Sequence, residues 1–278
     1  MNIERIKEKK HVKKSKFMLK AKSAFSFIFP FLLVGVIWEL AIRIGWITFT
    51  SLPAPSTLLQ GFWNMAFVRT IIWRHIGASM VRLITGYGLA VLIGIIIGAL
   101  LSLNSVLHNM FEPTLNLLLS VPTIAWVPIL LITLGLGDKT VVTAIFISAF
   151  FPIVYNVMRG IDIIQPSTKN AARMMGLQGT NLFINVLLPA SMLSIINGLR
   201  LALGYAWRAL VGAELLAALI EWGMGKMVYQ ARYFNDATVM MVGLLVIGIS
   251  GYLLDQIFLV AIERNTVEKW GLTRKKRN

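Results

Sequence analysis

The chain has 278 residues, of which 57% are hydrophobic and 14% are charged, and its mean hydropathy is +0.74. This composition is typical of a membrane protein and leaves no room for a large soluble domain beside several membrane spans. Cysteine is absent, which excludes disulfides, thiol catalysis and cysteine-based metal sites. The formal net charge of +15 could indicate nucleic-acid binding, but the basic residues gather at the two ends of the chain and the middle is apolar. We therefore expect no nucleic-acid partner.

The two ends of the chain are basic tails. Residues 1–23 contain nine Lys or Arg residues, and residues 263–278 contain six. Positive segments beside membrane spans stay in the cytoplasm and meet anionic lipid. The N-terminal apolar stretch is too long for a cleaved signal peptide, and no small-residue cleavage site follows it. We expect both termini to be cytoplasmic, with lipid as one partner and residues 24–262 as the membrane domain.

Six apolar stretches are long enough for the roughly 20 residues that a membrane-spanning helix needs. The predicted spans cover residues 24–44, 78–103, 110–134, 140–158, 192–219 and 238–262. The predicted fold is therefore an all-α polytopic membrane protein with six transmembrane helices. Residues 45–77 connect the first two spans, and residues 57–67 within this connection can form an interfacial amphipathic helix.

The second span carries small residues at four-residue intervals, namely Gly86, Ala90, Gly94 and Gly98. Such a stripe lets helices approach closely, either within the chain or at a homodimer seam. Arg82 is the one charge of this span, and we expect it to snorkel to the membrane interface. His75 stands alone, with no second ligand at metal-binding spacing, so we predict no metal site.

The third span contains prolines that predict an irregular helix. Glu112-Pro113 opens it, and Pro122 and Pro128 are expected to interrupt it. Missing backbone donors in a membrane helix favour a kink that faces protein or water rather than lipid. The stretch VPTIAWVPILL, with Pro122, Trp126 and Pro128, is therefore a candidate lining for a solute pathway. The alternative is a kinked helix that only packs.

Residues 161–189 form a polar insertion between the fourth and fifth spans. Ser167 or Thr168 can cap a first short helix of about nine residues, and Gly176 suits the left-handed residue that ends it. Thr180 can cap a second helix, and Pro189 is expected to mark the next break. So short a helix is marginal alone in water. We expect it to dock against another protein.

Three charges fall within the fifth span, namely Arg200, Arg208 and Glu214, and Asp255 falls within the sixth. Charges in a span usually face a cavity or a partner. Arg208 and Glu214 are about 120° apart around a helix, so they do not form an intrahelical pair. We expect each charge to meet water or a partner from elsewhere. Trp207, Arg208 and Glu214 are predicted to line the pathway.

The distribution of Lys and Arg supports this topology. The tails, the central insertion and Arg159 just before it together hold 18 of these residues, whereas the opposite side holds six. The six are Arg43, Arg69, Arg74, Lys139, Lys226 and Arg232. This asymmetry places the central insertion in the cytoplasm.

The central insertion resembles the "EAA" loop of the inner-membrane permease subunits of ATP-binding-cassette (ABC) importers. The resemblance rests on residues at the matching spacings: Asn170, Ala171, Ala172, Gly176, Val186, Leu188 and Pro189. Asn170 stands where the family usually has glutamate. An ordinary amphipathic loop would be the alternative interpretation.

Between residues 52 and 270 the chain also looks like the permeases of the nitrate/sulfonate/taurine group. The stretches LPAPS, SMVRLITGYGLAVLIGIIIG, VPTIAWVPILLITLGLGDK, GLRLALGYAWRALVGAELLAA and GYLLDQIF carry that resemblance. It implies a type I importer permease fold in a bacterial inner membrane. It also implies a homodimer of this permease, a cytoplasmic ATPase dimer that docks on residues 161–189, and an extracytoplasmic solute-binding protein.

The sequence has no GxxxxGK[ST] phosphate loop, no paired histidines and no Ser-His-acid arrangement. We therefore expect no enzyme activity and no cofactor in this chain, and ATP would be used by the partner ATPase. The resemblance favours a small anion as solute, and a heterocyclic vitamin precursor of the pyrimidine, thiamine or riboflavin type is the alternative. A secondary transporter that couples to ions through Glu214 and Asp255 stays open, as does a membrane scaffold or regulator.

Overall fold

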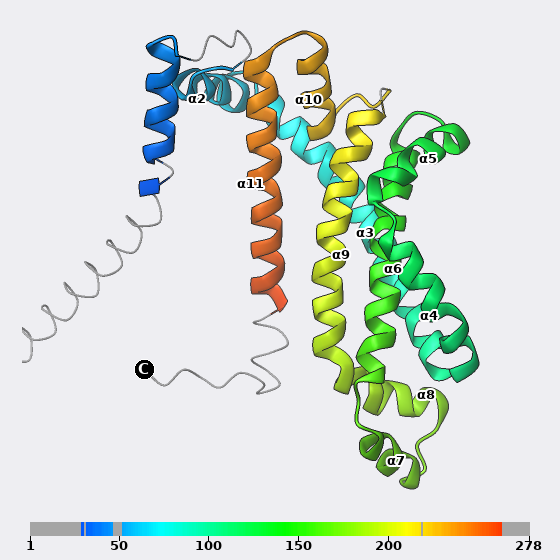
Figure 1. Cartoon of the computed structure of the whole chain (residues 1–278). Coiled ribbons are helices and arrows are strands. Elements are labelled where there is room, and N and C mark those ends of the chain that lie inside the picture. Colours follow the sequence, from blue (N-terminus) through cyan, green and yellow to red (C-terminus); the bar gives the residue numbers. More distant parts are fainter. Residues whose placement is uncertain (1–28, 31, 47–51, 218, 263–278) are drawn as a thin grey trace, which may run out of the picture.

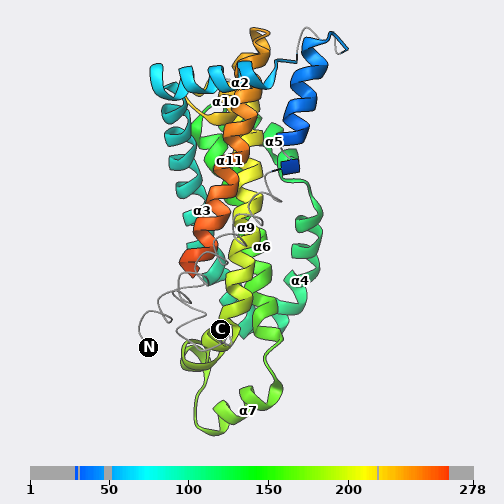
Figure 2. The same cartoon turned by 90° about the vertical axis from the view of Figure 1, so that its left-hand side faces the viewer.

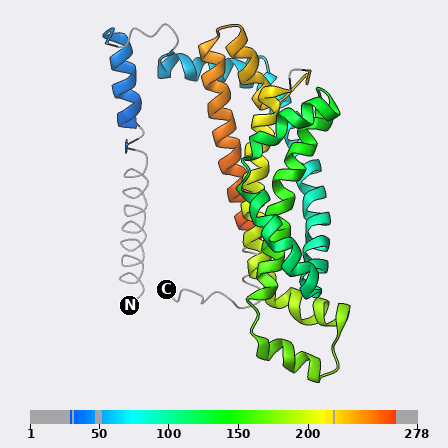
Figure 3. The same ribbon diagram turned by 45° about the vertical axis from the view of Figure 1, so that its right-hand side comes forward.

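The computed structural model describes residues 29–30, 32–46, 52–217 and 219–262. Within these residues all regular structure is helical, and the longest helices stand side by side as an upright bundle (Figure 1). The predicted basic tails, residues 1–23 and 263–278, lie outside the described residues. The first predicted span is described only in part, with residues 32–43 helical. This helix stands apart from the bundle (Figure 3).

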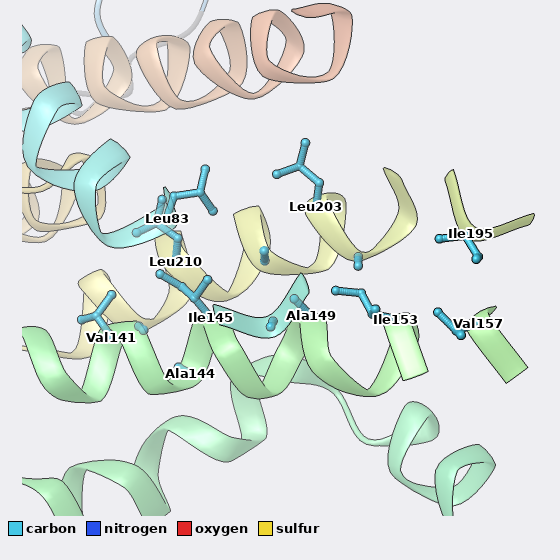
Figure 4. Packing of buried hydrophobic residues seen from close by; sticks show 14 of the residues in the cluster. Leu83, Val141, Ala144, Ile145, Ala149, Ile153, Val157, Ile195, Leu203 and Leu210 are labelled. Atoms are coloured by element: carbon cyan, nitrogen blue, oxygen red, sulfur yellow. The ribbon is translucent and has the colours of Figure 1, made fainter. Parts of the chain in front are cut away.

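The centre of the bundle is formed by α3 (Ile71–Leu103), α6 (Asp138–Asp162) and α9 (Leu188–Leu216). Branched aliphatic side chains from these helices fill the space between them, as Leu83, Ile145 and Leu210 show in Figure 4. The fourth long helix, α11 (Ala237–Ile262), lies beside α10 and α9. Such apolar helices bury side chains against one another and present the remaining apolar surface to lipid.

Four helical segments of the described residues are long and apolar enough to cross a membrane: 71–103, 138–162, 179–216 and 237–258. A bent pair, 105–120 with 123–134, makes a fifth if it counts as one span. These segments match the second to sixth predicted spans. The first predicted span is described only in part, so the number of six membrane-spanning helices stays a prediction.

The predicted interruption of the third span at Pro122 is confirmed, and it is a full break rather than a kink, because the structure divides the span into two helices. α4 (Ser105–Ser120) and the segment formed by a 3-10 turn (Thr123–Ala125) and α5 (Trp126–Leu134) meet at 89°. Pro122 lies at this break. Pro128 does not interrupt a helix, since it sits in the first turn of α5, where backbone N–H groups have no intrahelical acceptor anyway.

Two short helices cover one end of the bundle. α2 (Pro55–Trp63) continues into a π-helical turn (Asn64–Val68) and crosses over this end, which also carries α10 (Met224–Tyr233) (Figure 2). The predicted amphipathic helix, residues 57–67, falls within this segment. Leu58 and Ala66 point into the protein, whereas Trp63 and Phe67 are exposed with their rings 4.5 Å apart. We call this the α10 end, and the opposite one the α7 end.

The glycine stripe of α3 packs against α6 of the same chain. A Cβ atom added at Gly86 would lie 2.8 Å from the Cβ of Ile145 and from the carbonyl oxygen of Val142, and one at Gly98 would lie 2.7 Å from the Cβ of Val157. Close packing within the chain, the first of the two predicted uses of the stripe, is therefore confirmed.

Two neighbouring glycines of α3 provide a matched test of this packing. Gly86→Ala is expected to destabilise the protein by about 1–3 kcal/mol, because the added methyl group overpacks the contact with α6. Gly88→Ala is expected to be neutral or slightly stabilising, because a Cβ atom there meets nothing within 4 Å and alanine favours helix. Thermal unfolding of the two purified variants compares them. Equal melting temperatures would contradict the close α3–α6 contact.

At the α7 end, the central insertion folds into α7 (Pro166–Met174), α8 (Gly179–Leu182) and a π-helical turn (Phe183–Leu187) that runs into α9. The predicted caps were wrong, since α7 begins at Pro166 and α8 at Gly179, and neither has a side-chain cap. Pro189 does not break the chain direction either, and residues 179–216 form one continuous helical segment. The π-helical turn just before Pro189 widens the backbone and so accommodates the proline ring.

Candidate functional site

A cavity of about 230 Å³ lies at the break between α4 and α5, where α6 and α9 complete its wall. Three residues predicted to line a pathway border it: Pro122 at the break, Trp126 on α5 and Arg208 on α9. The other three, Pro128, Trp207 and Glu214, do not border it. Sequence reasoning did not single out Ser148 or Tyr205, which also lie in the wall. Serine in a membrane helix gives no signal of its own, because many serines bond to their own backbone.

Arg208 is the one charged side chain among the described residues that line the cavity. Its guanidinium lies over the ring of Tyr205, 5.4 Å from the ring centre, and forms no ion pair with any residue that the structure describes. An unpaired cation in an apolar helix bundle is costly unless it meets water or an anion. The cavity can therefore attract a negatively charged solute.

Glu214 lies instead in a buried polar network at the α10 end, and its side chain is 0% exposed. Its carboxylate accepts hydrogen bonds from Ser79 Oγ at 2.8 and 2.9 Å, from Arg82 Nη1 at 2.7 Å and from the backbone N–H of Gly225 at 2.9 Å. A Cβ atom added at Gly223 would lie 2.7 Å from this carboxyl group. Gly223 just before α10 and Gly225 in its first turn therefore let the chain close around Glu214.

The prediction that Arg82 snorkels to the interface was wrong, because Arg82 is 7% exposed and inside this network. Its Nε donates to Asp138 at 2.7 Å, and its Nη1 also donates to the carbonyl of Trp222 at 2.7 Å. His75 is buried too, with Nδ1 2.7 Å from the carbonyl oxygen of Gly223. Arg82 thus joins the α10 ends of α3, α6 and α9.

A further ion pair joins α9 to α11. Arg200 donates from Nε and Nη2 to the two carboxylate oxygens of Asp255, at 2.9 and 2.8 Å. Both side chains are partly exposed, 44% and 41%. Arg200, Glu214 and Asp255 therefore have partners on other helices, as the sequence predicted for span charges.

The central insertion projects beyond the α7 end of the bundle, as Figures 1 and 2 show. Ala172 is buried and ties α7 to the core, whereas Asn170 and Ala171 are exposed. Val186, Leu188 and Pro189 are half-buried where the insertion enters α9. Met174 and Met175 are 85% and 80% exposed, so α7 presents a bare apolar tip.

Gly176 ends α7 in the left-handed conformation that the sequence predicted, with φ of +88°. The N–H of Gly176 donates to the carbonyl of Arg173 at 3.0 Å, and the N–H of Leu177 donates to that of Ala172 at 3.1 Å. These two hydrogen bonds form a Schellman motif, which favours glycine at this position. A Cβ atom there meets nothing within 4 Å, so the need for glycine is conformational and not steric.

Comparison with known proteins identifies the family. Residues 90–266 match the family described as "Binding-protein-dependent transport system inner membrane component". The chain belongs to this family. Its members are permease subunits of ABC importers and not enzymes themselves, and membership implies an ATPase and a solute-binding protein as partners. The protein is therefore an inner-membrane permease subunit of a binding-protein-dependent ABC importer.

Three curated relatives show how far the similarity extends. The permease is 30% identical to the Escherichia coli taurine transport permease TauC over 79% of this chain and 80% of the relative. It is 30% identical to the putative aliphatic sulfonates permease SsuC of E. coli, over 81% and 85%. It is 32% identical to the bicarbonate permease CmpB of Synechococcus elongatus, over 80% and 82%.

The fold has a solved counterpart. A chain from inward-facing conformations of the MetNI methionine ABC transporter matches with a TM-score of 0.58 and 21% identity. The match covers 72% of this permease and 97% of that chain. At 21% identity the similarity supports the fold alone. It agrees with the predicted type I importer permease fold.

Proposed function

We propose that this permease forms the membrane pathway of an ATP-driven importer for a small anion, such as a sulfonate, nitrate or a taurine-like solute. The observation that carries this proposal is Arg208, an unpaired cation in a cavity whose described lining holds no carboxylate. The cavity, at about 230 Å³, is smaller than the roughly 300–1,000 Å³ of pockets for drug-sized ligands. It suits a solute of few atoms.

The relatives support the same chemistry. Taurine, aliphatic sulfonates and bicarbonate, which their names give, all present anionic oxygens. Within this permease, the pathway residues would be Pro122, Trp126 and Arg208 at the cavity. A cation in a wall of low dielectric attracts such oxygens more strongly than a cation in water does.

In this proposal, residues 161–189 couple the permease to a cytoplasmic ATPase dimer. The exposed tip of α7 would lie in a groove of the ATPase, a common way for a short helix to bind. ATP would bind and be hydrolysed on that partner, with no cofactor in this chain. Closure of the ATPase would then shift the spans between two packings that open the pathway to alternate sides. This places the α7 end and both termini in the cytoplasm.

A second copy of the permease completes the proposed assembly. Arg208 is exposed on a membrane-spanning helix, and a bare guanidinium at that position is unfavourable against lipid. A homodimer would cover this face and enclose the pathway between the two copies. A solute-binding protein would deliver the solute at the α10 end.

One observation favours the alternative solute, a heterocyclic vitamin precursor. Trp126 and Phe151 stand together in the cavity wall, with ring centres 6.4 Å apart. Aromatic side chains stack on flat heterocycles. The other alternative, an ion-coupled carrier, needs free carboxylates in the membrane. Glu214 and Asp255 are each ion-paired with an arginine, which argues against it.

Uptake by the reconstituted importer tests the proposal. With its ATPase and binding protein in vesicles, Arg208→Gln is expected to lower uptake of an alkylsulfonate or nitrate by at least about tenfold, because the anion loses a charge-assisted contact. Arg74→Gln is the matched control, since Arg74 also lies over an aromatic ring, that of Trp222, but outside the cavity. Uptake of a pyrimidine that is indifferent to Arg208→Gln would instead support the heterocycle.

A further inference from the structure

Ser148 on α6 carries a buried hydroxyl group that has no hydrogen-bond partner. The residue is 5% exposed, and its Oγ bonds to no atom of the described residues. Trp38 Nε1 is the other described side-chain atom with this property. Ser148 differs from Trp38 in its position, because it borders the cavity that Arg208 also lines. Buried polar groups nearly always find a partner, so an exception at a cavity wall points to a ligand.

Other hydroxyl groups of this bundle form a hydrogen bond to their own helix backbone that Ser148 lacks. Six of them donate to the carbonyl oxygen four residues earlier in their own helix: Thr85, Ser102, Ser120, Thr133, Thr143 and Ser191. This backbone contact is the usual one for serine and threonine in membrane helices. Ser148 lies in the middle part of α6 and does not form this backbone contact. Less than 1 Å² of its Oγ is accessible, so the hydroxyl reaches the cavity by rotation about a single torsion, χ1.

Pro152 adds a second polar group at the same place. In a regular helix the N–H of residue 152 would donate to the carbonyl of Ser148, and proline has no N–H. Pro152 also borders the cavity. The Ser148 carbonyl thus lacks its usual helix donor, but as an acceptor it does not attract an anion, so the hydroxyl is the group of Ser148 that could donate to one.

We propose that the Ser148 hydroxyl donates a hydrogen bond to an oxygen of the transported anion and acts as the neutral partner of Arg208. The inference rests on the proposed function, because it requires the cavity to lie on the solute pathway. Arg208 supplies charge without fixed direction, since its side chain is long and exposed. Ser148 supplies direction, since a short side chain on a packed helix holds its donor close to one point. The pair would select small oxyanions over other anions such as halides.

Ser148→Ala and Ser148→Thr in the reconstituted importer test this role. Ser148→Ala is expected to lower uptake of an alkylsulfonate by about tenfold, the usual effect of losing one hydrogen bond to a charged group. Ser148→Thr keeps the hydroxyl and is expected to retain most uptake. The control is Ser102→Ala, which removes a hydroxyl that bonds within α3, away from the cavity.

Thermal unfolding of the same variants separates this role from a structural one. Because the hydroxyl has no partner, Ser148→Ala is expected to leave the melting temperature unchanged or to raise it. A lower melting temperature, or uptake equal to that of the unchanged protein, would overturn the role of Ser148. If Arg208→Gln lowers uptake while Ser148→Ala does not, the failure concerns Ser148 alone. If neither variant lowers uptake, the proposed pathway itself fails.

Discussion

Arg82→Met is expected to lower the free energy of unfolding by about 3–5 kcal/mol, the usual effect of removing one partner from a buried ion pair. Glu214 is 0% exposed, and among the described residues Arg82 is the one cation that forms an ion pair with its carboxylate. Methionine would leave this charge buried without a counterion and would leave the Trp222 carbonyl without its donor. In the purified protein, tryptophan fluorescence on heating should show a melting temperature lower by on the order of 10 °C.

Two further variants show whether the loss comes from the charge. In Arg82→Met with Glu214→Gln, the neutral amide needs no counterion and still accepts from Ser79 and Gly225, so much of the stability should return. Arg200→Met breaks the partly exposed pair with Asp255 and should lower the melting temperature far less than Arg82→Met does, because exposed ion pairs contribute little to stability. If Arg82→Met and Arg200→Met had equal effects, the buried network would not be a main source of stability.

Replacing both Met174 and Met175 by glutamate is expected to abolish binding of the ATPase and to reduce ATP-driven uptake at least about tenfold. These side chains form the apolar tip of α7, and they contribute little to the fold because they are 85% and 80% exposed. Two carboxylates would have to be buried in the proposed groove, where their desolvation is unfavourable. Co-purification of the ATPase with the detergent-solubilised permease measures the first effect.

Phe234→Glu is the matched control for this experiment, because Phe234 is 74% exposed but lies at the α10 end. It should leave ATPase binding intact. Gly176 gives a second comparison: Gly176→Val forces a branched side chain into φ of +88°, whereas Gly176→Asn is tolerated there. ATPase binding should be lost in the valine variant and kept in the asparagine variant. Normal uptake by the methionine double variant would contradict the assignment of α7 as the coupling element.

Local patterns predicted the helical elements well. Runs of apolar residues gave the spans that the structure describes, and glycine at 176 gave the end of α7, because backbone conformation there depends on one residue. The glycines of α3 predicted a close helix contact, since their spacing places them on one face. The predicted caps at Ser167, Thr168 and Thr180 were wrong, because nearby prolines and glycines shifted where the helices begin.

The motif residues of the central insertion could be identified from the sequence because they lie within twenty positions of one another. The residues that line the cavity were identified only in part. Trp126 and Arg208 were predicted to line the pathway from their chemistry, but nothing in the sequence distinguished them from Trp207 and Glu214, which do not border the cavity. On one helix, Arg208 and Glu214 face different surroundings, a cavity and a buried network. Ser148 was not suspected at all, since its distinguishing property is a missing hydrogen bond.

The sequence by itself determined the class of this protein: an apolar chain with small-residue stripes, a polar central insertion and basic ends. These properties follow from composition and from spacing along a helix. The tertiary structure alone decided which charges are paired, because Arg82 meets Glu214 and Asp138 across 132 and 56 residues of chain. It also decided that, of the two prolines expected to interrupt the third span, Pro122 breaks it and Pro128 does not. Partners so distant in the chain are selected by the packing of whole helices, and no local pattern records that choice.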